Sequence, residues 1–136
     1  RLDEAIVGYR DAVKRWPRSA VTLNALGYTL ADRTGRFAEA EKLIRKALTH
    51  DPKSAAIIDS LGWVLYKLGR HEEALVELQR AFERLHDHEV ASHLVEVLAV
   101  LERRDEALAL LASAEERNPG SELLKDVRTR YFSETP

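Results

Sequence analysis

Apolar residues recur along this chain at helical spacing. Leu61, Leu65 and Leu68 stand three or four residues apart, and the segment 74–85 keeps the same interval. Because an α-helix turns once in 3.6 residues, such positions share one face, which packs against a neighbouring element. Gly69 separates the two runs. The pattern therefore predicts pairs of amphipathic helices joined by short turns.

The pattern itself repeats with a mean period of about 34 residues. Three markers recur at spacings of 35, 34 and 33 residues. These markers are Ala5, Ala40, Ala74 and Ala107; Ala12, Ala47, Ala81 and Ala114; and Pro17, Pro52, His86 and Pro119. A fixed period of this size indicates an array of stacked units, because a single helix hairpin cannot bury its own apolar face. A proline ends each unit where it occurs, since its ring and missing N–H stop a helix.

The arrangement resembles the tetratricopeptide repeat (TPR), which has Leu-Gly in its first helix, two alanines in its second helix and a final proline. Leu26-Gly27 and Leu61-Gly62 match the first helix, whereas Val95 departs from it. The resemblance implies an all-α fold: a right-handed α-solenoid of antiparallel helix hairpins, the TPR superhelix. Glycine at this position lets two helix axes approach closely, so we expect Gly27 and Gly62 at helix contacts.

The repeats predict one domain over residues 1–136. Its expected parts are a second helix of a truncated repeat (1–17), two repeats (20–52 and 54–86), a divergent repeat (88–119) and a capping helix (121–132). Ser121 is a suitable N-cap for the last helix. The charged residues that follow it predict a solvated face that closes one end of the solenoid.

Composition excludes several function classes. The 136 residues contain no cysteine, so disulfides and thiolate sites are impossible. The 21 basic and 23 acidic residues nearly balance, which argues against a nucleic-acid partner. No run of 18 apolar residues exists, which argues against direct membrane insertion. No nucleotide-loop, metalloprotease or serine-hydrolase motif is present. We expect no enzyme, no cofactor and no metal.

The family resemblance implies a concave groove lined by the first helices, where a segment of another protein binds. The expected lining residues are Asn24, Tyr28, Asp59, Trp63, Tyr66, Lys67, Ser92, His93 and Glu96. Asp59, Trp63 and Tyr66 share one helix face, apart from the leucine stripe of the same helix. Two roles stay open for Trp63 and Tyr66: anchors for a partner in the groove, or a seal between neighbouring first helices. Acidic residues prevail in this lining, which favours a neutral or mildly basic partner, extended or helical.

An alternative function is self-assembly. Leu2, Ile6, Tyr9 and Val13 form an apolar stripe on the first predicted helix. A helix of a preceding hairpin should cover this stripe. We therefore expect it to meet a neighbouring chain or a partner helix, which makes a homo-oligomer the rival prediction.

A narrower resemblance concerns the segments 26–32 and 61–66. Their sequences are similar to those of proteobacterial repeat proteins, including periplasmic lipoprotein adaptors that bring substrates to a carboxyl-terminal processing protease. This resemblance implies a bacterial periplasmic or outer-membrane-associated location rather than a cytoplasmic one.

Overall fold

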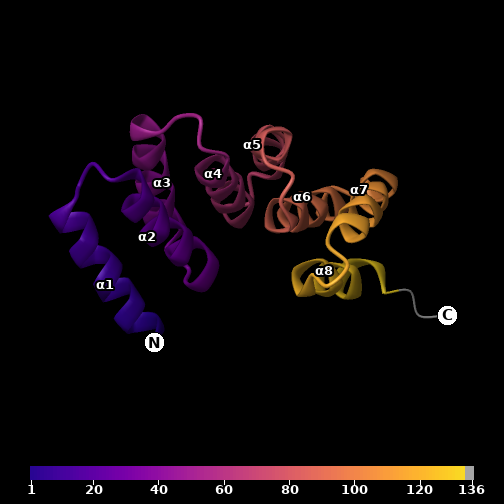
Figure 1. The fold of residues 1–136 in the computed structure, drawn as a ribbon, viewed down its shortest axis with the longest axis horizontal. Coiled ribbons are helices and arrows are strands. Elements are labelled where there is room, and N and C mark those ends of the chain that lie inside the picture. Colours follow the sequence, from indigo (N-terminus) through magenta and orange to yellow (C-terminus); the bar gives the residue numbers. More distant parts are fainter. Residues whose placement is uncertain (134–136) are drawn as a thin grey trace.

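A computed structural model describes residues 1–133, and residues 134–136 at the end of the predicted domain lie outside the described part. The described residues form eight α-helices (Figure 1). Their bounds are α1 Leu2–Arg15, α2 Ala20–Arg33, α3 Phe37–His50, α4 Ala55–Lys67, α5 His71–Arg84, α6 His88–Val100, α7 Arg104–Arg117 and α8 Glu122–Phe132.

The helices pack as successive antiparallel pairs. The hairpins are α2 with α3, α4 with α5, and α6 with α7. The first helices also contact one another in the order α2, α4, α6 and α8. Figure 1 shows the pairs following one another along the long axis, with α1 at one end and α8 at the other. The predicted all-α fold of stacked helix hairpins is confirmed.

The first helix of each hairpin begins with the same device. Ser19, Ser54, Asp87 and Ser121 are the N-caps of α2, α4, α6 and α8, and each side chain accepts a hydrogen bond from a backbone N–H in the first turn. Such a cap satisfies an N–H group that has no partner inside the helix. Four equivalent caps give four equivalent starting points, so residues at the same distance from each cap occupy equivalent places.

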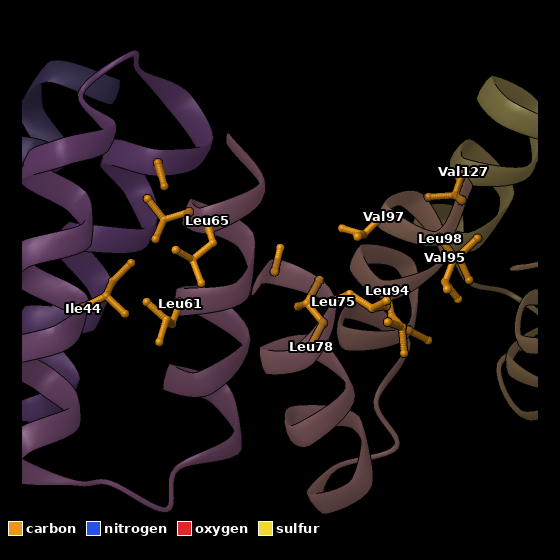
Figure 2. Close-up of a cluster of buried hydrophobic side chains, with 14 of the residues drawn as sticks. Ile44, Leu61, Leu65, Leu75, Leu78, Leu94, Val95, Val97, Leu98 and Val127 are labelled. Atoms are coloured by element: carbon orange, nitrogen blue, oxygen red, sulfur yellow. The ribbon is translucent and has the colours of Figure 1, made fainter. Parts of the chain in front are cut away.

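One main apolar core runs through the array. Its buried members extend from Leu23 in α2 to Phe132 in α8. Figure 2 shows fourteen of these side chains following one another across the array, from Ile44 to Val127. Because each hairpin buries its apolar face against the next, the stack is stabilised by its interfaces.

Gly62 allows α4 and α5 to approach closely. A Cβ atom built at this residue would lie 2.6 Å from Leu78 Cγ and 3.2 Å from Leu78 N. Gly27 has the same relation to Ile44, at 2.7 Å from Cγ1. The close helix contacts expected at these two glycines are therefore present.

Gly62→Leu is expected to lower the free energy of unfolding by about 1–3 kcal/mol, because the new side chain overpacks the contact with Leu78. Thermal and urea unfolding followed by circular dichroism measure this loss. Gly8→Leu is the matched control, since a Cβ at this helical glycine has no neighbour within 4 Å. Equal stability of the two variants would contradict the assigned helix contact.

The third hairpin forms although it departs from the repeat pattern. Val95 takes the place of Gly27 and Gly62 and is fully buried. Glu102 adopts the left-handed conformation (φ 61°) at the turn between α6 and α7, as Gly69 does (φ 82°) between α4 and α5. A non-glycine residue in this conformation carries local strain. The buried core at Val95 and Leu98 on one side, and Ala107 and Leu111 on the other, holds the hairpin together.

The two ends of the array differ in chemistry. At the C-terminal end, α8 buries Leu124, Val127 and Phe132. Arg128 of the same helix donates two hydrogen bonds of 2.8 Å to the carboxylate of Glu115, one to each oxygen. This pairing lowers the pKa of the Glu115 carboxyl, first through the hydrogen bond from Arg128.

At the N-terminal end, the predicted assembly stripe does not remain open as a whole. Ile6 and Val13 pack against the chain's own core, so the expectation that a neighbouring chain or a partner helix covers the stripe is wrong for these two residues. The reason is that α1 lies against α2, which turns this side of the helix inward. Leu2 is half-buried, and Tyr9 remains 36% exposed.

Candidate functional site

The residues expected to line the groove lie on the first helices, but many of them are not open to solvent. Five of the nine are buried: Asp59, Trp63, Ser92, His93 and Glu96. This face of α4 therefore takes part in packing, as the leucine stripe of the same helix does. Four of the five contact a neighbouring first helix: Asp59, Trp63, His93 and Glu96. Asn24, Tyr28, Tyr66 and Lys67 remain partly exposed.

Trp63 connects three helices. Its ring stacks on His93 of α6 with centroids 4.1 Å apart and on Tyr66 of α4 at 5.1 Å. Its Nε1 donates a hydrogen bond to Asp32 Oδ1 of α2 at 3.2 Å. Only 6% of the residue is exposed, and Lys67 Nζ lies 4.9 Å from the ring centroid. With these contacts, Trp63 fills the space between neighbouring first helices, which is the sealing role of the two that the sequence left open.

His93 and Asp59 form a buried ion pair between α6 and α4. His93 Nδ1 donates to Asp59 Oδ1 at 3.0 Å, and the two residues are 7% and 5% exposed. Burial acts to lower the pKa of His93, but the hydrogen bond and charge of Asp59, followed by Glu89 and Glu96, outweigh it and raise that pKa. The carboxylate thus favours the charged imidazolium.

Tyr28 extends this polar network to α2. Its hydroxyl donates to Glu89 Oε2 at 3.0 Å and lies 3.4 Å from His93 Nε2. Burial is the main cause of the raised pKa of Tyr28, with the charges of Asp32 and Glu89 adding to it. Ser92 Oγ donates to the backbone carbonyl of Glu89 at 2.7 Å, which completes its bonding within α6.

Glu96 joins α6 to α8 through a residue that the sequence did not single out. Arg130 donates to Glu96 Oε1 at 3.0 Å and also pairs with Asp126. Arg130 stands 34 residues after Glu96, as His93 stands 34 residues after Asp59. The repeat period was therefore the signal that could have identified this contact.

A hollow of about 280 Å³ crosses the first helices beside this network. Asn24 and Tyr28 of α2, Ser60 of α4 and Glu89 of α6 line it, together with Leu85 from the turn before α6. It therefore brings together residues from all three repeats. Leu85 is an exposed apolar residue that sequence reasoning did not include.

The hollow offers hydrogen-bond acceptors and negative charge. Asn24 Oδ1 is buried without a hydrogen-bond donor among the described residues. Asp59, Asp87 and Glu89 are also in the lining, and no Lys or Arg is among the lining residues. The acidic side chains of this lining favour a ligand that supplies N–H groups or a positive charge.

Within residues 1–133, no three His, Asp or Glu side chains gather in a way that could hold a metal ion. None of the helices in this same stretch has the length and apolar character needed to span a bilayer. Ser60 of the hollow donates its hydroxyl hydrogen bond to the backbone carbonyl of Ala56 at 3.1 Å. The geometry of the hollow suits non-covalent binding.

Known families and structures match this architecture. Two family models described as "Tetratricopeptide repeat" match residues 1–55 and 33–92. A curated relative, TPR repeat-containing protein PA4667 of Pseudomonas aeruginosa, is 51% identical over 87 residues, which are 64% of this chain. The match spans only 15% of the length of that relative.

Two solved TPR structures are similar over nearly the whole chain. TTC0263, a thermophilic TPR protein in Thermus thermophilus, superimposes with a TM-score of 0.82 at 27% identity, covering 97% of this chain and 72% of that protein. YrrB, described as a TPR protein with an unusual peptide-binding site, gives a TM-score of 0.69 at 27% identity and covers 97% and 68%. The repeat period, the stacked hairpins and these matches show that the chain belongs to the tetratricopeptide repeat family.

Proposed function

We propose that this chain is a non-catalytic protein-interaction scaffold that binds a segment of another protein in the hollow across α2, α4 and α6. The observation that carries this proposal is the lining of the hollow, which joins residues of three first helices and holds Asp59, Asp87 and Glu89 without any Lys or Arg. The hollow is partly open to solvent, so an extended or helical segment of a partner could place side chains in it.

The charges in the hollow favour a partner segment with a basic side chain. Glu89 and Asp87 are acidic residues of the lining, and Tyr28 supplies an aromatic surface beside them. A Lys or Arg side chain could meet a carboxylate while its aliphatic part lies against the ring. A backbone N–H of the same segment could reach Asn24.

Trp63 supports this site from behind. Because it is 6% exposed, its ring contributes to the spacing of α2, α4 and α6 more than to direct contact with a partner. Tyr28 and Leu85 offer more accessible apolar surface at the hollow. The similarity to YrrB, a TPR protein with a peptide-binding site, adds support for a peptide ligand.

Glu89→Gln is expected to weaken the binding of basic peptides by roughly 10-fold or more, because it removes one carboxylate charge from the hollow. The glutamine oxygen can still accept the hydrogen bond from Tyr28 OH, so the fold is kept. The probes are short peptides selected from a random library for binding to this chain. Isothermal titration calorimetry measures their affinity.

Glu116→Gln is the matched control, because this substitution changes the net charge by the same amount. Glu116 is exposed on α7, the second helix of its hairpin. It should leave the affinity unchanged. Selected peptides that bind the Glu89 and Glu116 variants equally well would contradict the proposed site.

A finer form of this proposal is an adaptor that presents a bound protein to a processing protease. Its support is the resemblance of segments 26–32 and 61–66 to periplasmic lipoprotein adaptors. In this form, the groove would hold the protein to be processed, and the catalytic step would belong to the protease.

A further inference from the structure

His93 is a buried base whose two ring nitrogens have partners on two other helices. Its Nδ1 lies 3.0 Å from Asp59 Oδ1 of α4, and its Nε2 lies 3.4 Å from the hydroxyl oxygen of Tyr28 of α2. An ionised carboxylate can only accept hydrogen bonds, so Nδ1 carries a hydrogen in both charge states of the ring. Nε2 is therefore the atom that gains and loses the proton.

The hydroxyl of Tyr28 stands between this atom and the hollow. It donates to Glu89 Oε2 at 3.0 Å. Tyr28 and Glu89 line the hollow, whereas His93 is not among the lining residues. Burial is the first cause of the raised pKa of Tyr28, so the hydroxyl keeps its one hydrogen to donate. Asp59, His93, Tyr28 and Glu89 thus form a chain of polar groups that crosses three first helices and ends in the hollow.

The direction of the hydrogen bonds along this chain depends on the charge of His93. When the ring is charged, Nε2–H donates to the Tyr28 oxygen, and the hydrogen of that hydroxyl is left for Glu89. When the ring is neutral, Nε2 is an acceptor that competes with Glu89 for the same hydrogen. A carboxylate that accepts fewer hydrogen bonds from its own chain is more available to a cation of a partner. Loss of the proton from His93 therefore frees Glu89.

The acidic groups around His93 place this proton loss above the range of an ordinary histidine. Burial acts to lower the pKa of His93, whereas the hydrogen bond and charge of Asp59 raise it. The charges of Glu89 and Glu96 on the same helix add to this effect, and the pKa is raised overall. From α8, Arg130 donates to Glu96 at 3.0 Å, which offsets part of that charge. His93 thus becomes neutral above about pH 6.5.

Two further charged groups act on His93 across the ring of Trp63. This ring stacks on His93 with centroids 4.1 Å apart. Asp32 of α2 accepts the hydrogen bond from Trp63 Nε1, and Lys67 Nζ of α4 lies 4.9 Å from the ring centroid. They carry opposite charges, so their effects on the imidazole oppose one another.

The titratable groups from α5 and α7 lie elsewhere. His86, after the end of α5, and Arg117 of α7 line a separate small hollow together with Ala91 of α6. Two residues along a helix turn by roughly 200°, so Ala91 and His93 lie on nearly opposite faces of α6. His71 of α5 contacts an aromatic ring of α4 instead.

We propose that the proton on His93 sets the affinity of the hollow for a basic partner segment: the charged ring turns the Tyr28 hydroxyl onto Glu89, and the neutral ring releases it. Loss of the proton also removes a positive charge from behind the hollow, so both effects strengthen binding as the pH rises. His93 is a positioning residue here, since it acts through Tyr28. The inference rests on the proposed function and adds its regulation.

The affinity of one basic peptide, measured by isothermal titration calorimetry from about pH 6 to about pH 9, tests this inference. The peptide is selected from a random library at the upper pH. It has arginine as its only ionisable residue and is blocked at both ends, so its own charge stays constant. Its affinity for the parent chain is expected to rise by roughly 5-fold or more and to level off once His93 is neutral.

His93→Gln should give a flat profile near the high affinity of the parent, because glutamine has no titrating proton. His50→Gln is the matched control at an exposed residue of α3 and should keep the rise. A second measurement needs no variant. By linkage, a bound cation disfavours the charged ring, so saturating peptide should lower the pKa of His93 that nuclear magnetic resonance of its ring reports.

Two results would overturn this inference alone. One is a parent profile equal to that of His93→Gln while Glu89→Gln still weakens binding. The other is a pKa of His93 that saturating peptide leaves unchanged. A peptide that binds Glu89→Gln as tightly as the parent would overturn the proposed function as well.

Discussion

Trp63→Ala is expected to lower the free energy of unfolding by about 3–5 kcal/mol, the usual cost of removing a large buried aromatic side chain. The loss has three parts. The ring stacking on His93 and on Tyr66 is lost, and Asp32 no longer accepts the hydrogen bond from Nε1. Because these partners lie on three first helices, the variant should also loosen α2 and α6 relative to α4. Urea unfolding gives the energy, and hydrogen exchange gives its location.

Trp16→Ala is the matched control because this second tryptophan is 55% exposed and contacts Arg15 through its ring face. It should cost less than about 1 kcal/mol. Trp63→Phe should fall between the two, since it keeps an aromatic ring but loses the bond to Asp32. Equal stability of the two alanine variants would show that Trp63 does not join the first helices.

Asp59→Ala is expected to cost about 3 kcal/mol or more in mildly acidic solution, because it leaves His93 buried without its ion-pair partner. His93 contacts Asp59 of α4 and Tyr28 of α2, and the charges of Glu89 and Glu96 on its own helix also act on it. Asp59 is the carboxylate hydrogen-bonded to its Nδ1. The charges of Glu89 and Glu96 are expected to compensate only in part for the loss of the Asp59 carboxylate.

The pH dependence follows from the raised pKa of His93. The folded state binds this proton more tightly than the unfolded state, whose histidine pKa is about 6.5. The stabilisation is therefore fully present below about pH 6.5 and is lost as the pH rises through the higher pKa of the folded state. The cost of Asp59→Ala should accordingly shrink on the alkaline side.

Unfolding free energies measured across this pH range test the sign. His93→Gln should remove the stabilising contribution and flatten the profile, whereas His50→Gln, at an exposed residue near the end of α3, should keep it. A parent protein with the same pH profile as His93→Gln would contradict a charged His93 in the folded state.

The sequence predicted the fold well because the repeat period specifies where each helix hairpin begins and ends. Alanines and prolines in register set the helix pairs, and Gly27 and Gly62 marked the close helix contacts that the structure shows. The third hairpin was harder to judge from sequence. Val95 and Glu102 break the local pattern there, and the buried core compensates for the break.

The polar stripe of the first helices was harder to interpret. Helical spacing places Asp59 and Trp63 on a common face, but it does not give the distance to the next first helix. That distance decides whether the face is a groove or an interface, and in the structure Trp63 and His93 fill the gap. Arg130 was missed because the last helix was assigned a solvated role, although its 34-residue spacing from Glu96 places it at the equivalent position.

The proposed function rests on binding of a partner segment in the hollow across α2, α4 and α6. Nuclear magnetic resonance measures this most directly, by titrating the ¹⁵N-labelled chain with a basic peptide selected from a random library. The largest amide shifts are expected at Asn24, Tyr28 and Glu89, and the side-chain amide of Asn24 should shift with them. Shifts confined to the second helices α3, α5 and α7 would contradict it.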